Sequence, residues 1–122
     1  MTEGKIFLTR EETKEKALRI LEFRSHSAFE LKEKLRRAGS TEEDIEYMID
    51  FCIEYNFIND REYAKMRARD LSNLKKFGKH RIKTELFRRG LSSEDIQYAL
   101  EEIEDDSDEL EILISKKLKG NF

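Results

Sequence analysis

Two stretches of the sequence decide the fold: SAFELKEKLRRAGSTEEDIEYMIDFC at residues 27–52 and GKHRIKTELFRRGLSSEDIQYALEEI at residues 78–103. They align without a gap at an offset of 51 residues, and the glycines Gly39 and Gly90 fall on each other. Self-similarity at a fixed period of this length is typical of a protein built from helical repeats. We therefore expect two copies of one helical unit.

Capping patterns divide each copy into helices. Thr9 with Glu12, and Ser27 with Glu30, have the spacing of a capping box, in which each side chain bonds the backbone of the other residue. Glycine or asparagine at a helix end supports a left-handed stop, as expected at Gly39, Gly90 and Asn56. These patterns predict six helices, over about residues 10–24, 28–38, 42–55, 60–74, 79–89 and 93–103, and a seventh from about residue 107.

The fold class that follows is all-α, with tandem three-helix, helix-turn-helix-like repeats in an elongated, curved array. The first repeat with an N-terminal extension is expected at residues 1–58, and the second at residues 59–106. Residues 107–122 would form the first helix of an incomplete third repeat, with Leu110, Leu113, Ile114 and Leu118 on its apolar face. No stretch has the strict period-two alternation of a half-buried strand.

Several apolar side chains are assigned to the core by their spacing. The third helix is expected to turn Ile45, Ile49, Cys52 and Ile53 inward, and Cys52 to be a buried structural thiol. Tyr47 and Tyr98 occupy equivalent repeat positions and are interpreted as packing residues rather than base-stacking platforms. His26, just before Ser27, is interpreted as a residue that leads into the second helix.

Composition limits the class of protein further. The 122 residues include no proline and five glycines, so little interrupts helix formation. The lone cysteine allows no disulfide within the chain, which fits a reducing compartment. No apolar run predicts a signal peptide or a membrane span, so we expect a cytoplasmic protein without a membrane partner.

Charge is strongly segregated along the chain. Residues 61–90 carry 11 Lys and Arg against 3 Asp and Glu, whereas residues 91–111 carry 10 acidic side chains and no basic ones. The acidic stretch could be a solvated helix, could complement a basic partner, or could fold back onto the basic one. Segregation of this kind indicates a charged binding surface that the net charge of -3 conceals.

Three motifs carry a resemblance to a known family. The run KFGKHRIKTELFRRG at residues 76–90 resembles the central signature of the RecX family. ALRIL at residues 17–21, followed by His26-Ser27 and Glu30-Leu31, resembles the first helix pair of that family. FINDREYA at residues 57–64 resembles the joint between its first two repeats. The resemblance covers about residues 12–106, but this chain lacks the complete third repeat that is usual in the family.

The resemblance implies a regulator of the RecA recombinase. Such proteins bind along the groove of the RecA–DNA filament or limit its growth, and thereby restrain strand exchange, ATP hydrolysis and repressor cleavage. That places the protein in DNA repair, recombination regulation and the SOS response. We expect a non-enzymatic monomer with no catalytic residue, metal or cofactor, whose DNA contact is mainly the single strand in the filament, with weak duplex binding possible.

The basic stretch supplies the candidate contact residues. Lys65 and Arg69 are four residues apart, so they share one face of the fourth helix. The full candidate set is Lys65, Arg69, Lys75, Lys76, Lys79, Arg81, Lys83, Arg88 and Arg89. Phosphates of DNA and an acidic surface of RecA are both possible partners for this set. Phe77 is expected to fill the joint between the fourth and fifth helices, and Phe87 could be an exposed anchor.

Two other classes of function stay open. A helix-turn-helix-like module could read duplex DNA without acting through RecA, using the fifth or sixth helix, although the acidic sixth helix would repel phosphate. A protein-interaction scaffold would involve no nucleic acid. The two histidines have no spacing that suggests a metal site, and no catalytic motif is present in the sequence.

Overall fold

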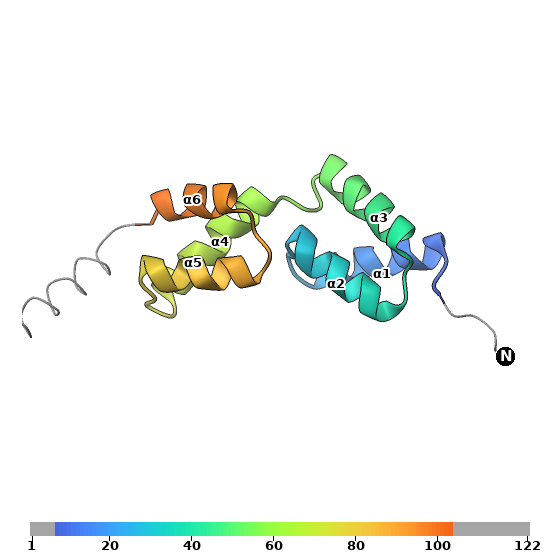
Figure 1. The fold of residues 1–122 in the computed structure, drawn as a ribbon, viewed down its shortest axis with the longest axis horizontal. Helices are drawn as coiled ribbons and strands as arrows, with labels where there is room; N and C mark the ends of the chain where they lie inside the picture. Colours follow the sequence, from blue (N-terminus) through green and yellow to red (C-terminus); the bar gives the residue numbers. More distant parts are fainter. Residues whose placement is uncertain (1–6, 104–122) are drawn as a thin grey trace, which may run out of the picture. The chain divides into compact units, whose positions relative to one another are not determined.

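The computed structural model describes residues 7–103, and every regular element within them is a helix. The helices are α1 (Arg10–Phe23), α2 (Ala28–Ala38), α3 (Glu42–Glu54), α4 (Asp60–Asn73), α5 (Lys79–Arg88) and α6 (Ser93–Glu101) (Figure 1). They belong to two compact units, one up to Tyr63 and one from Ala64. The prediction of an all-α fold with three-helix repeats is confirmed.

Side-chain caps fix where the helices begin. The Thr9 hydroxyl accepts the Glu12 N–H at 3.1 Å, and the Glu12 carboxylate accepts the Thr9 N–H at 2.9 Å. Ser27 and Glu30 form the same reciprocal pair, with both distances 3.1 Å. Each such cap stabilises a helix by about 1 kcal/mol. Both predicted capping boxes are therefore confirmed.

Left-handed residues end three of the helical segments as predicted. The φ angles are 104° at Gly39, 78° at Gly90 and 61° at Asn56. Glycine has no Cβ to clash in this region, and asparagine tolerates it better than most residues. Because these signals are local, they could be read from the sequence alone.

In the first unit, α3 packs against both α1 and α2. Its core consists of Ala17, Leu31, Leu35, Ile45, Met48, Ile49, Cys52 and Ile58. Cys52 is fully buried as predicted, and burial raises the pKa of its thiol. A buried hydrogen bond of 2.7 Å between the hydroxyls of Thr13 and Ser40 joins α1 to the α2–α3 turn.

The second unit buries the equivalent positions, with α5 packed against α6. Its buried apolar residues are Ala64, Ala68, Leu71, Ile82, Leu86, Leu91, Ile96, Ala99 and Leu100. Leu86 and Ile96 lie 51 residues after Leu35 and Ile45, and all four side chains are buried. The internal repeat seen in the sequence is thus a repeat of core positions.

One expectation about an apolar residue is wrong, and two tyrosines pack differently from core residues. Ile53 is 53% exposed, because at 100° per residue it lies about 90° from the centre of the buried stripe of α3. Tyr47 and Tyr98, interpreted as packing residues, are 47% and 36% exposed. Each ring instead lies under a cation, Arg10 at 4.2 Å and Lys65 at 5.4 Å from the ring centroids.

The expected seventh helix and the incomplete third repeat lie outside the described residues. Ile103, expected to point inward, is half-buried just beyond the end of α6. Among residues 7–103, no helix has the length and apolar character needed to cross a membrane.

Candidate functional site

The turn between α4 and α5 is held by backbone hydrogen bonds and one unusual residue. The Leu74 N–H donates to the Asp70 carbonyl at 2.8 Å, and the Phe77 N–H donates to the Leu71 carbonyl at 3.0 Å. Lys76 adopts a left-handed conformation with φ of 60°. A residue with a Cβ pays roughly 1 kcal/mol for this conformation. The chain reverses sharply here, which exposes the side chains on both sides of the turn.

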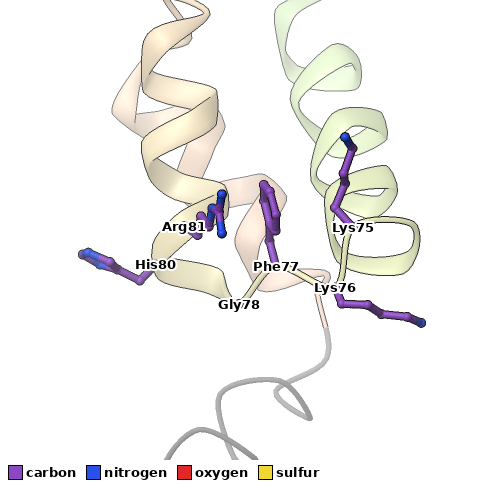
Figure 2. A pocket seen from close by; sticks show the side chains of 6 residues that line it. All are labelled: Lys75, Lys76, Phe77, Gly78, His80 and Arg81. Atoms are coloured by element: carbon purple, nitrogen blue, oxygen red, sulfur yellow. The ribbon is translucent and has the colours of Figure 1, made fainter.

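A hollow of about 320 Å³ lies at this turn. It is lined by Lys75, Lys76, Phe77, Gly78, His80 and Arg81, none of which is acidic. Figure 2 shows Phe77 and Arg81 facing the space between the two helices, with Lys75 on the α4 side. Lys76 and His80 point outward at opposite edges. Three of the nine candidate residues are thus brought together.

Arg81 is held in place by an aromatic ring. Its guanidinium carbon lies 3.9 Å from the centroid of Phe77, a cation–π contact. Glu85, one helical turn further along α5, pairs instead with Arg88 at 3.5 Å. Stacking covers a face of the guanidinium and leaves its in-plane N–H donors available to a ligand. Phe77 is half-buried, faces the space between α4 and α5, and orients Arg81.

Lys65 and Arg69 lie elsewhere and are partly neutralised. They share a face of α4 as predicted, but both contact the Glu102 carboxylate, at 3.4 Å and 3.8 Å. Lys65 also lies over the Tyr98 ring. Part of the acidic stretch therefore folds back onto the basic one, which was one of the three possibilities for it. These two cations are less available to an anionic partner than those at the turn.

The remaining candidates are spread along α5. Lys79 is its first residue and is half-buried, whereas Lys83 and Arg88 are exposed. Arg89 follows the helix as its C-terminal cap and is half-buried. None of these four lines the hollow, so their contact with a partner stays a prediction. Phe87, the possible anchor, is 73% exposed.

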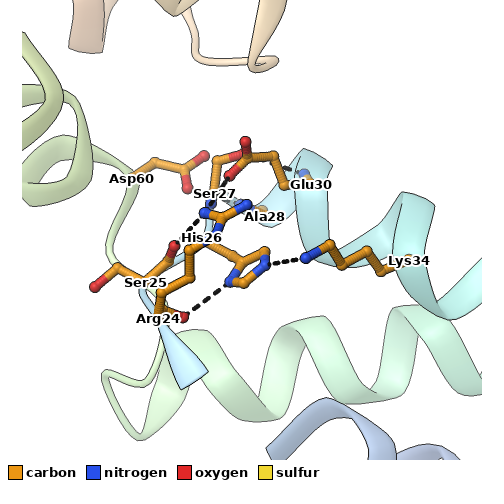
Figure 3. A network of polar contacts seen from close by, with 8 residues as sticks. All are labelled: Arg24, Ser25, His26, Ser27, Ala28, Glu30, Lys34 and Asp60. Atoms are coloured by element: carbon orange, nitrogen blue, oxygen red, sulfur yellow. Dashed lines mark hydrogen bonds and ion pairs between the residues drawn. The ribbon is translucent and has the colours of Figure 1, made fainter. Parts of the chain in front are cut away.

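The equivalent turn of the first repeat, between α1 and α2, has a closed polar network (Figure 3). Glu30 accepts the Ser27 N–H and lies 3.8 Å from the Arg24 guanidinium. The Ala28 N–H donates to the Asp60 carboxylate at 2.9 Å. Amides at the start of α2 thus find acceptors within the first unit.

His26 lies at the centre of this network and is only 2% exposed. Its Nδ1 lies 2.9 Å from the Arg24 carbonyl and its Nε2 lies 2.8 Å from the Lys34 ammonium. Because an ammonium only donates, Nε2 accepts and Nδ1–H donates, which fixes a neutral tautomer. Burial lowers the pKa of His26, and the positive charges of Arg24 and Lys34 lower it further.

Sequence reasoning missed what distinguishes the two turns. The offset of 51 places Phe77 on His26, Gly78 on Ser27 and Arg81 on Glu30. The second copy therefore lacks both partners of the capping box, and Gly78 offers α5 no side-chain cap. His80 was considered only as a metal ligand, but it lies at the edge of the hollow. The sequence signal that identifies the site is the set of positions at which the two copies differ, and the sequence reasoning used only the positions at which they agree.

Across residues 7–103, no three His, Cys, Asp or Glu side chains cluster where they could hold a metal ion.

Tandem three-helix domains with a cation-lined turn define a class of small all-helical proteins. Comparison with known families identifies the family within this class to which the chain belongs. The model of the first three-helix domain of RecX matches residues 14–52, and that of the second matches residues 59–100. The chain belongs to the RecX family.

Individual relatives agree with this assignment. Regulatory protein RecX of Vibrio parahaemolyticus is 38% identical over 109 residues, which are 88% of this chain and 70% of the relative. That of Clostridioides difficile is 39% identical over 95 residues, but these cover only 44% of the relative. The crystal structure of RecX from Lactobacillus salivarius matches with a TM-score of 0.78 and 26% identity, covering 92% of this chain and 73% of that one.

Proposed function

We propose that this protein binds the RecA–DNA filament and lowers the activity of the recombinase. It would act as a monomer in the cytoplasm, by occupancy rather than by catalysis. Membership of the RecX family supports a regulatory role. The proposal adds a contact surface to that role.

The α4–α5 turn is the observation that carries the proposal. Lys75, Lys76 and Arg81 gather around one hollow, and none of them forms an ion pair with another described residue. Elsewhere in the second unit, Lys65 and Arg69 already contact Glu102. The cations best able to meet an external anion are therefore those of the turn.

Electrostatics supports a nucleoprotein filament as the partner. A DNA strand repeats its negative charge along its length, and a protein that neutralises phosphates releases condensed counterions. Binding through the turn should then weaken steeply as salt is raised. An acidic surface of RecA would instead make association slower at high salt and change the final affinity less.

A helix-turn-helix module that reads duplex DNA by itself is a weaker candidate. In such modules the recognition helix presents the residues of its N-terminal end to the bases. The first turn of α6 carries Glu94 and Asp95, which would repel phosphate. This alternative would have to rely on α5, where Lys83 and Arg88 are exposed.

The experiment is ATP hydrolysis by RecA on single-stranded DNA, with the protein added in increasing amounts. The wild-type chain should inhibit hydrolysis well below one molecule per base. Alanine at Lys76, Lys79, Arg81 and Arg88 should weaken inhibition at least tenfold, a factor that corresponds to about 1.4 kcal/mol.

A matched control removes four cations from the first unit. The replaced residues are Lys16, Arg19, Lys32 and Arg37. This variant should inhibit nearly as well as the wild type, and circular dichroism should show unchanged helicity in both variants. Equal inhibition by the two variants would show that the contact surface lies elsewhere. Absence of inhibition by the wild type would contradict the proposed function itself.

A further inference from the structure

The hollow at the α4–α5 turn has a composition that suits one kind of ligand. Three of its six lining residues, Lys75, Lys76 and Arg81, are cations, His80 adds a ring that can donate a hydrogen bond, and Phe77 and Gly78 carry no charge. No carboxylate among the described residues pairs with Arg81, and its neighbour Glu85 forms an ion pair with Arg88 instead. Cations crowded without internal counter-charges repel one another, so an external anion should stabilise them.

Arg81 supplies the geometric part of the recognition. Its guanidinium is stacked on Phe77, with 3.9 Å between the guanidinium carbon and the ring centroid. A planar guanidinium offers two parallel N–H donors, which match two oxygens of a phosphate. Because the ring already holds the side chain, little rotamer freedom is lost when the ligand binds.

The backbone adds donors to the same place. Gly78 precedes α5 and has no side chain to accept the amides of the first turn. The equivalent Ser27 accepts an amide of α2, and Glu30 completes the capping box there. Amides at the start of a helix favour negatively charged ligands, phosphate in particular. In the second repeat Gly78 supplies no such side-chain cap.

The outer polar side chains favour a chain of phosphates over a single carboxylate. Lys76 and His80 point outward at opposite edges of the hollow, as Figure 2 shows. Directed apart in this way, they cannot both bind one small anion at its centre. They are placed to meet charges on either side of a central phosphate, and a nucleic-acid strand carries such charges at regular intervals.

We propose that the hollow binds a backbone phosphate of a single nucleic-acid strand. Arg81 and Lys75 hold the central phosphate, and Lys76 and His80 contact the strand on either side. This inference rests on the proposed function and deepens it, since it assigns this turn to the DNA of the filament rather than to RecA. The ligand chemistry is a phosphate diester.

The test converts the second turn into the first. Gly78→Ser combined with Arg81→Glu restores both partners of a capping box, and the φ of −79° at Gly78 is suitable for serine. The variant should therefore keep or raise the melting temperature. In fluorescence anisotropy with a labelled single-stranded oligonucleotide and no RecA, it should bind at least tenfold more weakly than the wild type.

The control is Lys16→Ala combined with Arg19→Ala, which lowers the net charge by the same amount. Both residues are exposed on α1, and neither lines the hollow. This control should lose less than about threefold in affinity if the loss at the turn is specific. Arg81→Lys, which keeps the charge but not the planar fork, should give an intermediate loss. Equal affinity of the G78S/R81E variant and the wild type would overturn the proposal.

Further outcomes distinguish a nucleic-acid strand from free phosphate as the ligand, and distinguish failure of the proposed site from failure of the proposed function. If inorganic phosphate saturates the hollow at concentrations at which the oligonucleotide does not bind, the assignment to a nucleic-acid strand is overturned. If the wild type inhibits RecA but G78S/R81E binds the oligonucleotide normally, the site is wrong and the proposed function stands. If the variant loses the oligonucleotide while the wild type leaves RecA unaffected, the site stands and the proposed function fails.

Discussion

The turn at residues 24–30 and the turn at residues 75–81 occupy equivalent places in the two repeats but have opposite chemistry. The first closes on itself, since Ser27, Glu30 and Asp60 accept the amides around the start of α2. The second has glycine and arginine where the first has serine and glutamate, and its cations surround a hollow. All seven equivalent positions of the two turns differ, so the same place in the repeat is a structural turn in one copy and a candidate binding site in the other.

The largest effect is expected from converting the first turn into the second. Ser27→Gly combined with Glu30→Arg removes both caps and leaves the Ser27 amide without its acceptor. It also places a third cation beside Arg24 and Lys34. We expect the free energy of unfolding of the first unit to fall by about 2–3 kcal/mol. Urea denaturation followed by circular dichroism measures it.

The reciprocal change is the natural control for that measurement. G78S/R81E should be neutral or stabilising by about 1 kcal/mol, because it adds a cap and replaces one of the crowded cations, Arg81, with a carboxylate. Similar losses from both double variants would mean that the two turns do not differ as described.

A pH effect confined to the first turn is expected next. Because the folded state lowers the pKa of His26, the unfolded chain binds a proton more readily. The stability contributed by neutral His26 is therefore complete above about pH 6.5 and is lost as the pH falls below it. His26→Phe, which installs the residue of the second turn, should make the unfolding free energy less sensitive to pH between about 7.5 and 5.5. An unchanged pH dependence in this variant would refute the assigned role of His26.

The smallest effect is expected at Lys76. Glycine adopts a positive φ without steric cost, so Lys76→Gly should relieve the turn. Higher entropy of the unfolded chain offsets part of that gain, which leaves a net stabilisation of at most about 1 kcal/mol. The same change at Ser25, the equivalent position, where φ is not positive, should destabilise instead. A thermal melt of each variant decides between these outcomes.

The fold could be predicted because its signals are local. The capping boxes at Thr9 and Ser27 and the left-handed stops at Gly39 and Asn56 depend on neighbours within a few residues. The internal repeat then predicted that equivalent positions of the two copies are buried. The prediction that Ile53 points inward failed. The width of the buried stripe of a helix depends on what packs against it, and spacing along one helix does not supply that information.

The candidate site could be predicted only in part. The sequence indicated the right basic stretch, but charge alone did not separate Lys65 and Arg69, which pair with Glu102, from Lys75 and Arg81. That separation depends on contacts between residues more than thirty positions apart. The left-handed Lys76 was also missed, because lysine does not favour that conformation.

The most direct test follows both turns in one experiment. Amide signals of the ¹⁵N-labelled protein are recorded while a single-stranded oligonucleotide is added. The account predicts that the amides of Gly78, Lys79 and Arg81 shift and saturate, while those of Ser27 and Glu30 stay in place. Equal shifts in the two turns, or shifts at the first turn alone, would contradict it.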